Sequence, residues 1–207
     1  MLMLLAAACW QAKAQQVSVA PYDGGRLAAL SLTFDDGLQD QYTLAYPELR
    51  KRGLRATFAS IGSKRDTMWL YRWVEGLIAQ GEWGVGMTHG IACGYDHFKD
   101  PQVMWALLDY LVERQHRIWV APFREVAAYI KERQQTRLDV SKVDGRLLVK
   151  PVCMIDARLF RQPLTMVVEG DAPLHVIQDG KELNVCRKDG VTLVDFNPHG
   201  GEIVVSY

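Results

Sequence analysis

Two adjacent carboxylates are the residues of this sequence whose type and position most clearly offer chemistry. Asp35 and Asp36 stand in the segment 33–37 (TFDDG), directly after the apolar run 27–34. In α/β folds, active sites lie at the carboxyl ends of parallel strands. Adjacent side chains diverge there, so one carboxylate can bind a metal ion while its neighbour contacts a water molecule. The alternative is a polar strand-to-helix turn, which also favours Asp and Gly.

Aromatic residues near a later strand are candidates for stacking against a ligand. Trp83 stands beside glycines, and Tyr95 follows the predicted strand 84–88. For each of them, stacking on a substrate and burial in the core fit the sequence equally well. Trp69 and Trp73 share one face of a predicted helix, and we expect both in the core.

The elements that would position these residues alternate between strands and helices. The periodicity predicts strands at 27–34, 55–61, 84–88 and 117–121, and helices at 39–52, 68–79, 101–115 and 123–133. Such alternation indicates parallel βαβ units. We therefore expect an α/β region that forms an incomplete (β/α) barrel or an open parallel sheet.

A different pattern follows residue 137. Short β-type runs stand at 147–154, 164–168, 175–178, 191–195 and 202–206. Turn signals separate them, among them Asp-Gly pairs at 144–145, 179–180 and 189–190. Regularly spaced runs with such turns favour a small antiparallel β-sandwich. We place the domain boundary near residue 137, which gives domains at 22–137 and 138–207.

Several motifs of the first region resemble one family. The segment 32–37 (LTFDDG) is similar to the first motif of the polysaccharide deacetylase family, also called the NodB-homology or carbohydrate esterase family 4 fold. The segments 46–53 (YPELRKRG) and 55–58 (RATF) resemble the helix and strand that come after that motif in the family. The segment 87–91 (MTHGI) resembles its last motif, which places a histidine at a strand end. The segments 109–111 and 118–123 match family members that carry a C-terminal β-domain.

The resemblance implies a role for each matching residue. Asp35 would be the catalytic base that activates a metal-bound water, and Asp36 would be a metal ligand. His89 would be the acid that protonates the leaving amine or alcohol. The implied cofactor is Zn²⁺ or another divalent metal, and the implied substrate is an acetylated polysaccharide or oligosaccharide. The implied fold is a NodB-type (β/α) barrel.

The sequence departs from the family by an internal gap. The motif H-(S/T)-x-x-H, which supplies two metal ligands, and the motif R-x-P-(Y/F) are both missing. At about thirty residues per βα unit, roughly two or three units of the barrel are absent. A catalytic zinc usually has three protein ligands, so Asp36 alone is an incomplete site. His89 and His97 are the substitute ligands to consider. Unpaired sheet edges would favour self-association.

The charge balance of the sequence bears on whether the protein binds nucleic acid. Lys plus Arg and Asp plus Glu both number 24, so the net charge is zero, and no basic surplus supports nucleic-acid binding. No segment after the N-terminus is apolar for long enough to span a membrane.

The N-terminus has the pattern of an export signal. Residues 1–10 are almost wholly apolar and run into a small-x-small site, so we expect residues 1–14 to be a cleaved signal peptide. A lipoprotein anchor at Cys9 is a weaker alternative. Cys153 and Cys186 can form a disulfide or remain free thiols; the sequence does not decide between these.

Two functions remain in competition at this point. The first is a hydrolase that removes acetyl groups from a carbohydrate through an amide or ester bond and is impaired by the missing histidine pair. The second is an exported, non-catalytic protein that binds or scaffolds glycan. A third interpretation is a defective gene product that cannot close its barrel.

Overall fold

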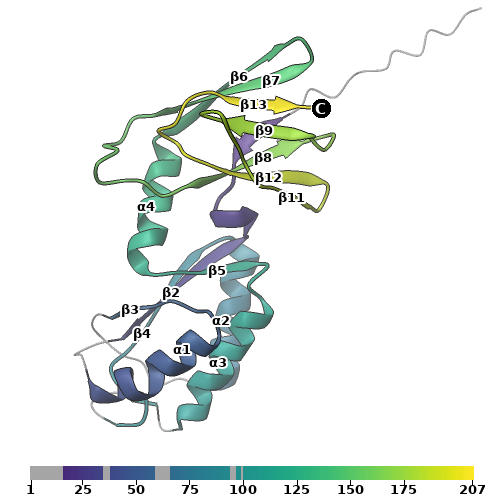
Figure 1. Ribbon diagram of the computed structural model, residues 1–207. Helices are drawn as coiled ribbons and strands as arrows, with labels where there is room; N and C mark the ends of the chain where they lie inside the picture. Colours follow the sequence, from purple (N-terminus) through teal and green to yellow (C-terminus); the bar gives the residue numbers. More distant parts are fainter. Residues whose placement is uncertain (1–15, 35–37, 59–65, 94–96, 99) are drawn as a thin grey trace, which may run out of the picture.

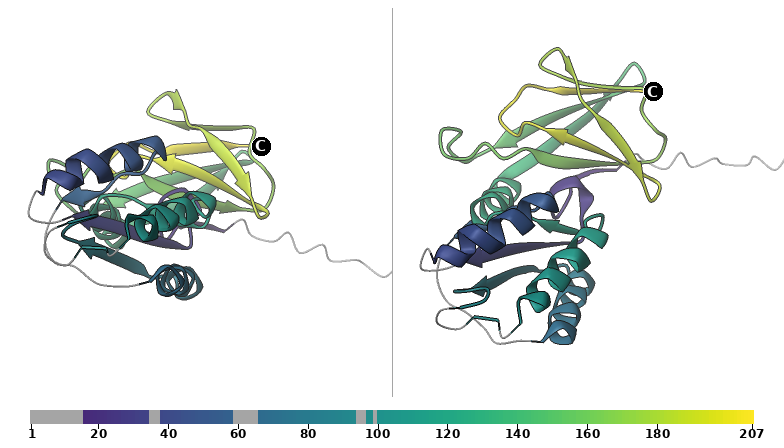
Figure 2. Two further views of the ribbon diagram at one scale, coloured as in Figure 1. Left: turned by 90° about the horizontal axis from the view of Figure 1, so that it is seen from below. Right: turned by 60° about the horizontal axis from the view of Figure 1, so that its bottom comes forward.

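The computed structural model describes residues 16–34, 38–58, 66–93, 97–98 and 100–207. These residues form a mixed α/β structure with a parallel sheet and two antiparallel sheets. In Figure 1 the antiparallel sheets lie at one end of the molecule and the parallel sheet with its helices at the other. Figure 2 shows the same two regions from two further directions.

The parallel sheet is organised around β2 (Ala28–Phe34). β4 (Trp83–Thr88) pairs along one edge of β2. The other edge is shared, because β5 (Ile118–Val120) pairs with its first half and β3 (Thr57–Phe58) with its last two residues. In the described part of the chain these strands make an open sheet and do not close into a barrel.

All seven residues of β2 are buried, including the two small polar residues Ser31 and Thr33. Leu30, Leu32 and Phe34 belong to a buried cluster formed with the helices. Ala29, which precedes Leu30, belongs to a second cluster that extends into the antiparallel sheets. Because successive side chains point to opposite faces of a strand, β2 contributes to both cores.

Helices cover the sheet, and two of them begin at a side-chain cap. The helices are the π-helix η2 (Gln41–Ala45), which continues into α1 (Tyr46–Lys51), then α2 (Thr67–Gln80), α3 (Pro101–Glu113) and α4 (Phe123–Gln134). Asp66 accepts a hydrogen bond from the backbone N–H of Trp69 and begins α2; Asp100 does the same for Gln102 and begins α3. Gly81 ends α2 in the left-handed conformation.

The antiparallel strands of the described ranges form two groups. The four-stranded sheet has the order β1 (Val17–Val19), β8 (Leu164–Glu169), β12 (Val191–Phe196) and β11 (Val185–Lys188). The five-stranded sheet has the order β10 (Lys181–Glu182), β9 (His175–Gln178), β13 (Ile203–Ser206), β7 (Arg146–Cys153) and β6 (Thr136–Val143). Asp144, Asp179 and Asp189 have φ of 48°, 51° and 49°, and each precedes a glycine, as two-residue hairpin turns require.

The parallel and antiparallel regions are joined through a shared core. Trp119 of β5 and Tyr129 of α4 belong to the same buried cluster as Val149, Met166 and Val205 of the antiparallel sheets. The Tyr129 and Trp119 rings meet edge to face at 5.4 Å. Because this cluster draws on both regions, we expect α4 to be a structural connection and not a free linker.

Cys153 and Cys186 are free thiols in the structure, as is Cys93. The sequence left open whether Cys153 and Cys186 form a disulfide, and in the structure they do not.

Candidate active site

Three parallel strands end together at one edge of the sheet. In the pairing register Phe34, the last residue of β2, lies opposite Phe58 of β3 and Thr88 of β4. Asp35 and His89 are therefore the residues that directly follow two paired positions. Asp35 and Asp36 themselves lie outside the described residues. The register explains how segments far apart in sequence reach one edge.

The short strand β3 is held at this edge by α4. The Arg55 guanidinium donates two hydrogen bonds to the carboxylate of Glu125, at 2.7 and 2.6 Å. The Thr57 hydroxyl accepts a hydrogen bond of 2.8 Å from the backbone N–H of Phe123. These contacts add to the pairing of β3 with β2, which among the described residues joins two positions of each strand.

His89 lies at the start of the loop that leaves β4. It is only 7% exposed. Its backbone carbonyl accepts a hydrogen bond of 2.6 Å from the side-chain amide of Gln41. The Thr88 hydroxyl donates to the carbonyl of Gly90 at 3.1 Å and fixes the next turn of the loop. The backbone around His89 is thus held by Gln41 and by the hydrogen bond between Thr88 and Gly90.

Asp40 organises the rest of this loop. Its Oδ2 atom accepts hydrogen bonds from the backbone N–H groups of Ile91, Ala92 and Cys93, at 2.8, 3.0 and 3.4 Å. Asp40 was not among the predicted site residues, because it belongs to no motif and stands within a predicted helix. An aspartate shortly after the Asp-Asp-Gly turn was the only available signal.

Gly90 is required by close packing inside the loop. A Cβ atom placed there would lie 1.9 Å from the carbonyl oxygen of Cys93 and 3.2 Å from Cβ of His97. The first contact is with backbone, so the loop would have to move.

We expect Gly90→Ala to lower the free energy of unfolding by about 1–3 kcal/mol, the usual range for overpacking, and to displace His89. Thermal unfolding together with the ring-proton NMR signals of His89 measures both effects. Gly145→Ala is a control for the loss of a glycine, since nothing lies within 4 Å of its added Cβ, although its φ of 78° adds local strain. Unchanged His89 signals in Gly90→Ala would contradict this account.

The remaining candidates from the sequence have different places. Trp83 begins β4 and so lies at the opposite end of the strand from His89. Its indole N–H donates to the Ser31 hydroxyl at 3.1 Å, and its ring packs against Phe123 at 4.7 Å. Tyr95 lies outside the described residues. His97 is close to the His89 loop, because its Cβ is near the space beside Gly90.

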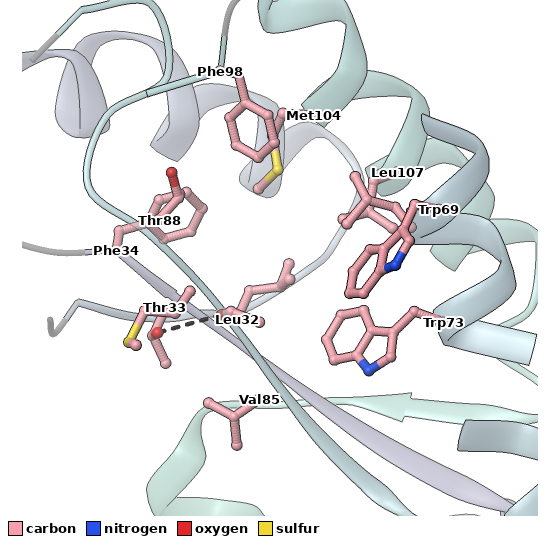
Figure 3. Close-up of a pocket in the computed structure, with 13 residues that line it drawn as sticks. Leu32, Thr33, Phe34, Trp69, Trp73, Val85, Thr88, Phe98, Met104 and Leu107 are labelled. Atoms are coloured by element: carbon pink, nitrogen blue, oxygen red, sulfur yellow. Dashed lines mark hydrogen bonds between the residues drawn. The ribbon is translucent and has the colours of Figure 1, made fainter. Parts of the chain in front are cut away.

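A cavity of about 220 Å³ opens next to these strand ends. Figure 3 shows Trp69 and Trp73 of α2 on one side, with Leu32 and Phe34 of β2 facing them. The two indole rings stack at 6.0 Å, and Trp69 is 40% exposed. We expected both tryptophans in the core: Trp73 packs against the buried cluster, whereas Trp69 is exposed. Thr88, which precedes His89, also lines the cavity.

Comparison with known proteins identifies the family of the parallel region. Residues 26–118 match the family model described as polysaccharide deacetylase. This segment is a polysaccharide deacetylase domain. It is a partial NodB-type domain, and the C-terminal β-rich region is consistent with the architecture that the sequence motifs implied. No match to a curated protein was found.

Polysaccharide deacetylase domains are generally metal-dependent, so we tested whether the residues present fit a metal ion. Within the described ranges, no three His, Cys, Asp or Glu side chains converge to hold one. Asp36, the expected ligand, lies outside those ranges, and the sequence contains no H-x-x-x-H pair. The described residues therefore do not supply a zinc site, and we derive no catalytic step through a metal. No described helix is long and apolar enough to cross a membrane.

Proposed function

We propose that the chain is a polysaccharide deacetylase-like hydrolase that removes acetyl groups from a carbohydrate polymer or oligosaccharide. The observation that carries this proposal is the family match over residues 26–118. The pairing of Phe34 with Thr88 supports it, since Asp35 and His89 directly follow these two residues.

The chemistry proposed for these residues is general acid–base hydrolysis. The Asp35 carboxylate takes a proton from the attacking water, and His89 gives a proton to the leaving amine or alcohol. Water adds to the acyl carbon, the C–N or C–O bond breaks, and the products are acetate and the free amine or hydroxyl. Asp36 is the proposed ligand of a divalent metal. Tyr95 remains a proposed sugar contact, whereas Trp83 lies at the end of β4 away from His89 and is no longer a candidate.

A second candidate function is an exported glycan-binding or scaffold protein without turnover. The observation that favours it is the missing histidine pair, together with the lack of a metal-ligand cluster among the described side chains. A site with one carboxylate ligand is short of the three that a catalytic zinc usually has.

The proposal extends to the organisation of the chain. Residues 1–14 are a signal peptide, residues 22–137 an incomplete NodB-type barrel, and residues 138–207 a β-sandwich domain. The protein is exported to the periplasm or the extracellular space. Self-association through the free edges of the parallel sheet is part of the same proposal.

Acetate release from N-acetylated and O-acetylated oligosaccharides tests the two functions. If the chain is a hydrolase, Asp35→Asn should lower kcat at least about 100-fold, because a positioned general base contributes on that order. His116→Ala is the control and should retain activity, because His116 is exposed and precedes β5, which pairs with the opposite end of β2. Zinc content, measured on the wild type and on Asp36→Ala, reports the metal separately.

The outcomes separate the candidates. Acetate release that depends on Asp35 supports the hydrolase, and stoichiometric zinc that Asp36→Ala loses supports its metal site. Binding of the oligosaccharide with equal affinity by wild type and Asp35→Asn, without acetate release, supports the glycan-binding protein. Zinc-free, folded protein without activity would contradict the hydrolase.

A further inference from the structure

The Asp40 carboxylate is buried and points away from its own helix. Its residue is 7% exposed. Asp40 lies in the helical segment that leads into η2, with φ of −70° and ψ of −22°, and its side chain makes no capping hydrogen bond. Aspartates at helix starts usually accept from the first free N–H groups of their own helix. Asp66 and Asp100 do so in this protein, and Asp40 does not.

The hydrogen bonds that reach the Asp40 carboxylate from described residues come from the loop after β4. Three consecutive backbone N–H groups, those of residues 91–93, converge on Oδ2, and the Cys93 thiol lies 3.8 Å from the same atom. Oδ1 is buried and has no hydrogen-bond partner among the described residues. A carboxylate loses solvation on burial and is tolerated only when other groups stabilise it. Here the stabilisation comes from the loop that begins at His89.

We propose that Asp40 is a positioning residue for His89. Its carboxylate fixes residues 91–93, and through them the direction in which the chain leaves β4 and the orientation of the His89 side chain. Gln41, the next residue, acts on the other end of the same turn by donating to the His89 carbonyl at 2.6 Å. The catalytic meaning of this arrangement rests on the proposed function; the positioning itself does not.

Asp40 also connects the segment that follows β2 with the loop that follows β4 and carries His89. Asp40 follows Gly37 by three residues along the chain. Its contacts lie on the loop after β4, so the segment that follows β2 and the segment that carries His89 are tied by a hydrogen-bonded contact beyond the ends of the paired strands. Three backbone donors converge on one oxygen atom, and the two shorter hydrogen bonds, from Ile91 and Ala92, restrict the loop most.

The experiment uses NMR on the full chain and does not depend on activity. Amide hydrogen exchange at Ile91 and Ala92 reports the loop, and the ring-proton shifts of His89 report its orientation. Asp40→Ala should speed exchange of both amides at least about tenfold and shift the His89 ring signals. Asp40→Asn keeps an oxygen acceptor and should give a smaller change in the same direction.

Asp100→Asn is the matched control, because Asp100 is an exposed cap that accepts from a backbone N–H of its own helix. It should leave the His89 signals unchanged. If Asp40→Ala does not fold, Asp40→Asn and Gln41→Glu, which replaces the donor to the His89 carbonyl by an acceptor, test the same positioning role.

The two readouts distinguish a positioning role from a merely structural one. Faster amide exchange with altered His89 signals supports the proposal. Faster exchange with unchanged His89 signals would overturn it and leave Asp40 as a loop anchor only. If the wild type releases acetate, Asp40→Asn should lower kcat with KM unchanged. An inactive wild type with altered His89 signals in the variants would contradict the proposed function and leave the positioning intact.

Discussion

Tyr129→Ala is expected to lower the free energy of unfolding by about 3–5 kcal/mol, the usual loss for truncating a buried aromatic side chain. Tyr129 is fully buried in the cluster that joins the two regions. Its hydroxyl donates to the carbonyl of Ala20 at 3.1 Å and accepts from the backbone N–H of Thr165 at 3.3 Å. The substitution therefore leaves a cavity and removes the partner of both backbone groups. Urea unfolding followed by fluorescence measures the loss.

Tyr129→Phe separates the two contributions. It keeps the ring and removes the hydroxyl, so it should cost about 1–3 kcal/mol, the range for leaving buried polar groups unsatisfied. Tyr42→Ala is the control, because Tyr42 is 76% exposed and its loss should change stability by no more than about 0.5 kcal/mol. A loss below about 1 kcal/mol in Tyr129→Ala would contradict the view that this residue joins the regions.

The same residue predicts an alkaline limit to stability. Burial raises the pKa of Tyr129 from 10.0 to about 12, with smaller opposing contributions from its hydrogen bonds to Thr165. The folded protein therefore keeps a phenol proton that the unfolded chain releases. Its contribution to stability is present below the unfolded pKa of 10.0 and decreases as pH rises toward the folded value. Tyr129→Phe should remove this part of the pH dependence.

Glu132→Gln is expected to weaken the pH dependence of the free energy of unfolding, because it removes an acidic group from a fully buried position. Glu132 is fully buried on α4. Its Oε1 atom accepts from the backbone N–H of Gln162 at 2.9 Å, while Oε2 has no partner among the described residues. Burial raises the pKa of Glu132 above its ordinary value, while the hydrogen bond from Gln162 and the charge of His199 act in the opposite direction. A glutamine retains the acceptor and carries no charge.

The direction of the pH effect depends on the raised pKa. The folded protein binds the Glu132 proton more tightly than the unfolded chain, so wild-type stability decreases as pH rises from the ordinary value of 4.5 through the raised folded pKa. Glu132→Gln should flatten this part of the curve. Glu202→Gln, at an exposed position, is the control and should leave it unchanged. A pH dependence of stability that is the same in wild type and Glu132→Gln would contradict this account.

Local sequence signals predicted the parallel region well because its elements have strong boundaries. The strand expected at 27–34 is β2 (Ala28–Phe34), and the helix expected at 68–79 is α2 (Thr67–Gln80). Burial on both faces leaves β2 rich in apolar residues, and Asp66 and Gly81 mark the two ends of α2. The Asp-Gly turns likewise predicted hairpins, which the left-handed aspartates confirm.

Strands without an apolar signal were missed. β6 (Thr136–Val143) is mostly exposed and polar, so its periodicity is weak, although the turn at Asp144 implied a strand before it. β1 (Val17–Val19) depends on pairing with β8, which no local pattern reveals. Asp40 was missed for a similar reason, because its partners lie on a distant loop. The roles of Asp35, Asp36 and Tyr95 remain predictions, since these residues lie outside the described ranges.

The pairing of β1 with β8 also determines when the four-stranded antiparallel sheet can form during synthesis. Val17 pairs with Val168, and β5 pairs with β2 from the far end of the deacetylase domain. During synthesis, β1 cannot pair until β8 has left the ribosome, and its edge stays unpaired until then. Contacts so distant in sequence slow folding. A nascent chain stopped before β8 would therefore expose an unpaired β1 edge, and chaperone binding would be concentrated in that interval.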